Sequence, residues 1–276
     1  MHKYTSRMLL GSLLLIGVPI AHATNHFSID TGANFSSGDY GGDTTTDIWS
    51  APFTAAYRTD RWTLTLTVPY VHIRGSGSVI PGTGPVDNSN PLGRGLGDLL
   101  GGGSSSGGST SRAATSASGF GDVVASAGYA LLSSADRSFA LDLTGKVKFG
   151  TADVNKGLGT GQNDYGLSVD SYKVLGKWTP FGGVGWMSYG SSPYIKLKNG
   201  MNANAGVDYR VAGNDHLGMY YSYRERISVG GATQSEVAAY WKHKFSHGFR
   251  LQSYALAGMA NGSPDYGVGA SLNYTF

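Results

Sequence analysis

The C-terminal stretch "YGVGASLNYTF", from Tyr266 to Phe276, alternates strictly between two kinds of residue. Apolar or aromatic residues take every second position, and Gly, Ser, Asn and Thr stand between them. A period of two is typical of a β-strand with one apolar and one polar face. The ends of soluble domains are usually frayed and polar. This pattern at the end of the chain therefore indicates a strand that must bury the whole of one face.

The same alternation recurs along the chain, for example in "RWTLTLTVPY" (61–70) and "FALDLTGKVKF" (139–149). Pro52, Pro69 and Pro180 fall inside such stretches. Proline has no backbone N–H to donate, and β-bulges near the strand ends would accommodate these three residues. The predicted strands span about 26–37, 46–58, 61–74, 119–132, 137–150, 162–174, 177–189, 200–211, 216–227, 235–245, 248–259 and 265–276.

The connections between these strands alternate in length. Those after even-numbered strands are short, and those after odd-numbered strands are longer and rich in Gly, Ser, Asn and Asp. A β-sandwich gives no reason for this alternation, whereas outer-membrane barrels have short periplasmic turns and long external loops. The sequence predicts an all-β fold, a 12-stranded antiparallel up-and-down transmembrane β-barrel. A soluble β-sandwich is the alternative.

The composition excludes several classes of protein. Of 276 residues, 43 are Gly, only 14% are charged and none is Cys, so disulfides and thiolate metal sites are ruled out. No apolar run of about 18 residues follows the N-terminal segment, which excludes membrane-spanning helices. Without Lys3 and Arg7 the chain has 19 basic against 18 acidic residues. We therefore expect no nucleic-acid partner, and nothing indicates a metal or cofactor.

The first 23 residues have the pattern of a secretory signal peptide. Lys3 and Arg7 precede an apolar stretch from Met8 to Val18, and "AHA" (21–23) has the form of a cleavage site. We expect cleavage near Ala23, which leaves a barrel domain over 24–276 that is exported to the bacterial outer membrane.

Aromatic residues gather toward the ends of the predicted strands, as in the two girdles that flank the membrane in outer-membrane barrels. A preference of aromatics for strands would explain their presence but not this clustering. The predicted girdle consists of Trp49, Tyr57, Trp62, Tyr70, Tyr129, Phe139, Trp186, Tyr209, Phe245, Phe249, Tyr274 and Phe276. The last strand must pair with the first, because an open edge in a bilayer leaves backbone groups unsatisfied. Its ending resembles the assembly signal of Gram-negative outer-membrane barrels, with Tyr274 and Phe276 at the signal positions.

Charged residues on the polar faces are the candidate functional residues, since rings of charge set ion preference in pores. Equally, they could pair across strands and fill the lumen. The ten basic and six acidic candidates are Asp30, Arg58, Arg61, Asp122, Asp142, Lys146, Lys148, Asp170, Asp208, Arg210, Arg224, Arg226, Glu236, Lys242, Lys244 and Arg250. Arg224 and Arg226 with Lys242 and Lys244 form the densest predicted cationic cluster. Such a cluster needs counter-ions, which Glu236 and the inward aspartates or, alternatively, an anionic solute would supply.

The longest connection, about 75–118, contains the low-complexity stretch "NPLGRGLGDLLGGGSSSGGSTS" (90–111). We expect a flexible extracellular loop. Alternatively, the loop folds inward as a constriction through Leu96, Leu99 and Leu100.

Catalysis is not indicated. His26, His72, His216, His243 and His247 are the histidines after the signal segment, but no serine lies in a recognisable nucleophile motif. We expect that the chain is not an enzyme. An outer-membrane hydrolase remains an alternative.

Two stretches, "FSSGDYGGDTTTDIWSAPFTAAYRTDRWTLTLTVPY" (35–70) and "GFGDVVASAGYALL" (119–132), resemble a bacterial outer-membrane family. That family is assigned to the meta-pathway of phenol degradation and is often labelled simply "transporter". The resemblance implies a porin-like barrel that passes small organic molecules. We expect a passive channel for small molecules, hydrophobic or aromatic ones among them, or else a structural or adhesive surface barrel with a closed lumen. The expected partners are outer-membrane lipid, lipopolysaccharide, the barrel-assembly machinery and a small-molecule solute.

Overall fold

The computed structural model describes residues 25–90 and 115–276. The predicted signal peptide and Leu96, Leu99 and Leu100 lie outside these residues. No helix in the described ranges is long and apolar enough to cross a membrane. The strands are β1 (His26–Gly38), β2 (Thr46–Arg58), β3 (Trp62–Gly75), β4 (Val79–Ile80), β5 (Gly84–Pro85), β6 (Thr115–Phe120), β7 (Val123–Ser133), β8 (Phe139–Phe149), β9 (Asp164–Lys173), β10 (Trp178–Ser188), β11 (Gly200–Ala212), β12 (Asp215–Arg224), β13 (Gln234–Lys244), β14 (Phe249–Gly258) and β15 (Tyr266–Thr275).

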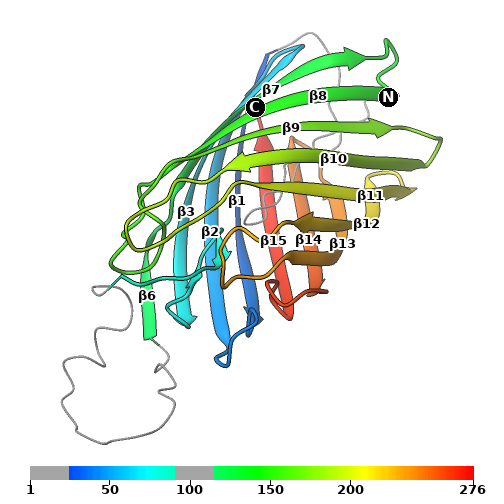
Figure 1. The fold of residues 1–276 in the computed structure, drawn as a ribbon. Helices are drawn as coiled ribbons and strands as arrows, with labels where there is room; N and C mark the ends of the chain where they lie inside the picture. The colour runs from blue at the N-terminus through cyan, green and yellow to red at the C-terminus, as the bar shows by residue number, and fades with distance from the viewer. Residues whose placement is uncertain (1–24, 91–114) are drawn as a thin grey trace, which may run out of the picture.

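All strands except the β4–β5 hairpin belong to one antiparallel sheet that closes on itself. The strands from β7 to β15 pair in chain order. β3 pairs with β2 and with both β6 and β7, and β1 pairs with both β2 and β15. Figure 1 shows this closure, with β1 in blue beside β15 in red. β6 and β7 both pair with β3 and together take the place of one strand in the wall. The barrel wall therefore has twelve strand positions. The predicted 12-stranded barrel is confirmed, and the β-sandwich alternative is wrong.

The predicted strand positions agree closely with the structure, with two differences. The strand predicted over 119–132 is divided, since Gly121 and Asp122 interrupt it between β6 and β7. The register against β3 shifts by one residue there, beside Pro69, which lacks the amide hydrogen that a regular ladder needs. The strand predicted over 216–227 ends earlier, at Arg224.

Short and long connections alternate as predicted. Residues 59–61, 134–138, 174–177, 213–214 and 245–248 make the short turns at one end of the barrel. Loops such as 150–163 and 189–199 are at the other end. The loop after β3 departs from the prediction of a plain flexible segment. Residues 79–85 form a small hairpin, β4–β5, in which Val79 pairs with Pro85.

The two faces of the wall differ as the alternation requires. In β3, Leu64 and Leu66 are 46% and 47% exposed, whereas Thr65 and Thr67 between and beside them are buried. Side chains at alternate positions of a strand point to opposite faces. Apolar side chains therefore cover the outside of the barrel, and hydroxyls and charges point inward.

The C-terminal strand closes the barrel, which explains its strict pattern. Asn273 is opposite Asp30 across the β1–β15 ladder, and the Phe276 amide donates to the Phe27 carbonyl over 3.0 Å. The Phe276 ring lies 5.6 Å from Phe27 and 4.8 Å from Tyr274. The last residue thus continues an aromatic group on the outer face.

Changing Tyr274 and Phe276 together to serine is expected to reduce the yield of assembled barrel and leave export unaffected. The substitutions remove ring contacts at the closing seam, where an unpaired edge is costly. Heat-modifiable mobility on gels of outer-membrane fractions measures the folded amount. A normal yield of folded barrel from this variant would contradict an assembly role for the two rings.

Candidate functional site: the barrel interior

Most of the predicted charges lie on the inward-facing positions of their strands. The exceptions are Asp122, which lies between β6 and β7 but still lines the interior cavity, and Arg61 and Arg226. Arg61 lies in the turn before β3 and donates to the Tyr129 hydroxyl over 3.1 Å, and both arginines are exposed. Arg226 follows the end of β12. Alternation determines the face only within a strand, so the prediction is wrong for both.

Asp164 in β9 was not predicted as an interior charge, although it has the same alternation parity as Asp170. With Asp164 included, the inward set has eight basic and seven acidic residues. They are Arg58, Lys146, Lys148, Arg210, Arg224, Lys242, Lys244 and Arg250, and Asp30, Asp122, Asp142, Asp164, Asp170, Asp208 and Glu236. The interior is therefore close to electrically balanced, and a role of these charges in ion preference stays a prediction.

One interior lysine forms two ion pairs near the end with the long loops. The Lys148 ammonium lies 2.8 Å from Asp122 and 2.9 Å from Asp164. Asp122 comes from the break between β6 and β7, and it also accepts from the Ala152 amide over 2.9 Å. These bonds join the wall segment formed by β6 and β7 to β8, β9 and the loop between them. The break in the wall is thus stabilised from the inside.

A second network lies toward the end with the short turns. The Asp208 carboxylate is 2.6 Å from His216 Nδ1 and 3.2 Å from the Lys242 ammonium, and it accepts from the Tyr240 hydroxyl over 3.0 Å. Asp208 is only 4% exposed. Its partners come from β12 and β13, so one carboxylate joins three neighbouring strands.

The predicted cationic cluster does not form. Arg224 is opposite Gln234 at one end of the β12–β13 pair, whereas Lys242 is opposite His216 at the other. Eight residues of strand separate the two positions along β13, which corresponds to about 26 Å. Arg226 is exposed and lies beyond the end of β12, and Lys242 has Asp208 as its counter-ion. These four residues therefore give no support for an anionic solute.

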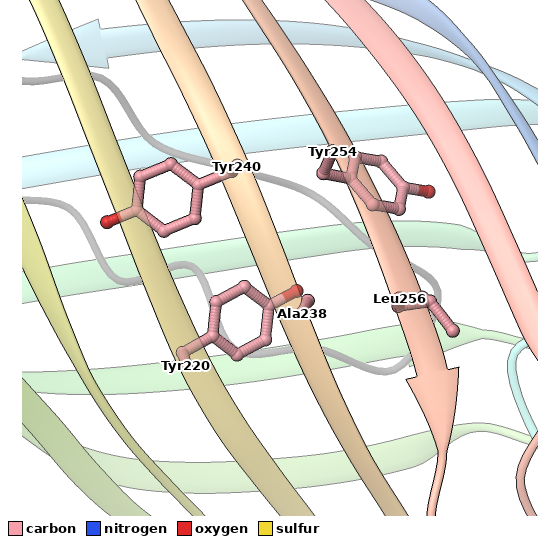
Figure 2. Close-up of a cluster of buried hydrophobic side chains, with 5 residues drawn as sticks. All are labelled: Tyr220, Ala238, Tyr240, Tyr254 and Leu256. Atoms are coloured by element: carbon pink, nitrogen blue, oxygen red, sulfur yellow. The ribbon is translucent and has the colours of Figure 1, made fainter.

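Tyrosines on the inward face form a layer that the sequence prediction missed. Tyr220, Tyr240 and Tyr254 are buried together with Ala238 and Leu256 on β12, β13 and β14 (Figure 2). The Tyr254 hydroxyl donates to Asn34 Oδ1 over 3.0 Å, which crosses from β14 to β1.

Glycine makes room for these rings. A Cβ atom at Gly218 would collide with the Tyr240 ring, and one at Gly269 would collide with the Tyr254 ring. Both glycines are directly opposite the tyrosines concerned, on the same inward face. Glycine at an inward position opposite a tyrosine is therefore a sequence signal that could have placed the rings inside.

A cavity of about 290 Å³ lies inside the barrel toward the long loops. Its polar lining includes Lys146, Arg224 and Glu236, and its apolar lining includes Val71 and Leu256. The hairpin loop contributes a further group of lining residues, Ile80, Pro81, Gly82 and Gly84. The cavity is thus bounded by the wall on its sides and by the β4–β5 hairpin at one end.

The mouth of the barrel is packed by a small apolar cluster. Ile73 at the end of β3 is fully buried with Val79, Leu158 and Tyr40 from three different loops. Burial raises the pKa of Tyr40 to about 12. Its hydroxyl therefore stays neutral and lies 3.1 Å from Ser36 Oγ as an ordinary hydrogen-bonding group.

The predicted girdle residues lie near the strand ends as expected. Toward the short turns, Trp62 is 4.8 Å from Tyr129 and Phe249 is 4.6 Å from Tyr274. Trp178, which the prediction omitted, lies 4.5 Å from Tyr209 in the same group. Tyr57, Phe139, Phe245 and Phe276 are at this end also, and Trp49, Tyr70 and Trp186 are toward the long loops. Contact of these rings with membrane interfaces stays a prediction.

None of the histidines in the described ranges lines the interior cavity. His72 Nδ1 lies 2.6 Å from Ser118 Oγ, but neither residue lines the interior cavity. His216 belongs to the Asp208 network, and His243 lies 2.8 Å from Asp215 at the start of β12. Among residues 25–90 and 115–276, no group of three or more His, Asp or Glu residues could hold a metal ion.

Comparison with known proteins finds similarity in structure alone. No family model and no curated protein matches the chain. An outer-membrane channel from Pseudomonas putida F1 is similar over 93% of this chain and 97% of its own, with a TM-score of 0.66 and 16% identity. The NanC porin is similar over 90% of this chain and 98% of its own, with a TM-score of 0.51 and 9% identity.

A third similar structure is the KdgM porin in complex with disordered oligogalacturonate. It covers 90% of this chain and 99% of its own, with a TM-score of 0.50 and 10% identity. These three structures are channels or porins. At such low identities the likeness shows the fold, which is a barrel of the outer-membrane channel type.

Proposed function

We propose that this chain is an outer-membrane protein that lets small molecules cross by passive diffusion through its barrel. The observation that carries the proposal is the cavity of about 290 Å³ within a closed barrel whose charged and hydroxylated side chains point inward. Apolar side chains on the outer face suit lipid. The similar channel and porin structures support the same function.

Unsatisfied polar atoms support a wet interior. The side-chain amides of Asn204 and Gln252 are buried, and neither has a hydrogen-bond partner among the described residues. The Tyr220 hydroxyl is in the same situation. Buried polar groups almost always have partners, and water supplies them where protein does not. A lumen that admits water favours a channel over the alternative of a closed structural barrel.

The mixed lining of the cavity suits small organic solutes. Val71 and Leu256 offer apolar contacts beside charged side chains such as Lys146 and Glu236. Hydrophobic or aromatic solutes, which the family resemblance implies, therefore fit this lining better than inorganic ions do. The proposal involves no enzymatic activity, and an outer-membrane hydrolase is the weaker alternative because neither His72 nor Ser118 lines the cavity.

The proposed orientation follows from the loop lengths. The short turns face the periplasm, together with the start of β1 and the end of β15, and the β4–β5 hairpin lies on the extracellular side. Export would require cleavage of the signal peptide near Ala23. Assembly would involve the barrel-assembly machinery, outer-membrane lipid and lipopolysaccharide.

Liposome swelling tests the proposed function. Vesicles that contain the purified protein should swell in solutions of small neutral organic solutes, and the rate should fall as the solute becomes larger than the cavity admits. Vesicles without protein are the control. Swelling no faster than the control with all solutes would instead support the closed structural barrel.

A further inference from the structure

The β4–β5 hairpin reaches from its own loop onto the inner wall of the barrel. The Thr83 carbonyl accepts a hydrogen bond from Arg224 Nη2, across 141 residues of sequence. Gly84 has a φ of +85°, and a Cβ atom there would collide with the Gln234 side chain. The hairpin tip therefore packs directly against two interior side chains, and glycine at position 84 permits this approach.

Apolar packing holds one side of the hairpin. Ile80, Val86 and Ile195 are almost fully buried together, and Leu197 packs against them. Asn88 pairs with Ile195 in an isolated β-bridge, and the Ser89 amide donates to the Tyr194 carbonyl over 3.0 Å. These contacts join the hairpin to the loop between β10 and β11.

Asp87 holds the other side of the hairpin. Its carboxylate Oδ2 accepts from the Gly230 amide over 2.7 Å and from the Ser228 hydroxyl over 3.2 Å. Its own amide donates to Ser228 Oγ over 3.0 Å. Three hydrogen bonds thus connect one loop residue to the loop between β12 and β13, at the mouth of the barrel.

These attachments differ from those of the wall. The β4 and β5 strands pair only with each other, so the hairpin has no ladder bonds to the closed sheet. Displacing it would break side-chain and loop contacts, whereas displacing a wall strand would break ladder hydrogen bonds on both sides. Since four of its residues line the cavity, its departure would open the cavity toward the mouth.

We propose that the β4–β5 hairpin sets the size limit of the channel, and that Asp87 is the positioning residue that holds it in place. This inference rests on the proposed function. It assigns the constriction to residues 79–85 within the described part of the loop.

Single-channel recording of Asp87→Ala beside the wild type tests the inference. Loss of the hydrogen bonds to the carboxylate is expected to raise the time spent at a larger conductance by about fivefold. Larger solutes should also swell liposomes that contain the variant. Asp43→Ala is the matched control, because Asp43 is an exposed carboxylate in the β1–β2 loop at the same end of the barrel. It should behave as the wild type.

Two further variants cover the possibility that Asp87→Ala fails to fold. Gly84→Ala should displace the hairpin from Gln234 and increase conductance without any change at Asp87. The double variant Asp87→Cys and Ser228→Cys introduces two cysteines into a chain that has none. Oxidation to a disulfide between positions 87 and 228 should hold the hairpin and keep wild-type conductance. Reduction of that disulfide in the same sample should raise the conductance.

The outcomes separate this inference from the proposed function. A conducting wild type whose conductance and size limit are matched by the folded hairpin variants would overturn the role of the hairpin alone. Folded wild-type and variant proteins that all fail to conduct or swell liposomes would overturn both. Larger conductance in the hairpin variants, with Asp43→Ala unchanged, would support the inference.

Discussion

Replacing Asp208 with alanine is expected to lower the free energy of unfolding of the barrel by about 3 kcal/mol, because removing one member of a buried ion pair leaves its partners unpaired. Lys242, His216 and Tyr240 all lose the same carboxylate. We take the lower end of the usual range because Lys242 and His216 are 17% and 19% exposed at the side chain. Equilibrium unfolding by guanidinium in lipid vesicles measures the change.

Two controls distinguish the network from a general effect of losing a carboxylate. Asp215→Ala removes an exposed carboxylate paired with His243, so stability should change little. Lys242→Met in the Asp208→Ala background should recover part of the loss, because it removes the unpaired ammonium. Equal losses for Asp208→Ala and Asp215→Ala, with no recovery by Lys242→Met, would contradict the network's contribution.

Replacing Leu66 with arginine is expected to destabilise the assembled barrel by about 2–4 kcal/mol, the cost of an arginine on the lipid face near the midplane. Leu66 is 47% exposed and lies midway along β3 between Trp62 and Tyr70. The residues opposite it, Ala55 and Ala125, are small and offer no counter-ion. The folded fraction after refolding into lipid vesicles, measured by heat-modifiable mobility, should fall.

Ser50→Arg provides the matched comparison. Ser50 lines the interior cavity, so this substitution adds the same charge on the opposite face of the wall. Its barrel should fold with a smaller loss than Leu66→Arg, since the inward face is polar and wet. Equal loss for the two variants would mean that the outer face does not contact lipid. Greater loss for Ser50→Arg would reverse the assignment of the faces.

The fold could be predicted from the sequence because a closed barrel imposes the same pattern on nearly all of its strands. One face of β3 is Thr at 63, 65 and 67 and the other is Leu at 64 and 66, so the strand and its two faces follow from alternation alone. The hairpin could not be predicted in this way. Its strands have two residues each, and the contact between Thr83 and Arg224 spans 141 residues.

The interior was predicted in outline but not in its contacts. Alternation placed Asp208 and Lys242 on the inward face but could not show that they form an ion pair across β12. It failed for Arg61 and Arg226, because each lies just beyond the end of a strand. Tyr240 and Tyr254 were missed because aromatics were assigned to the outer face, although glycines opposite them make room inside.

Conductance of the purified protein in planar lipid bilayers is the most direct test of the central claim. We expect discrete conductance steps. In a salt gradient, we expect a reversal potential that indicates only weak ion selectivity, because the inward charges are nearly balanced. Failure of folded, heat-modifiable protein to produce any conductance would contradict the channel and leave a closed structural barrel.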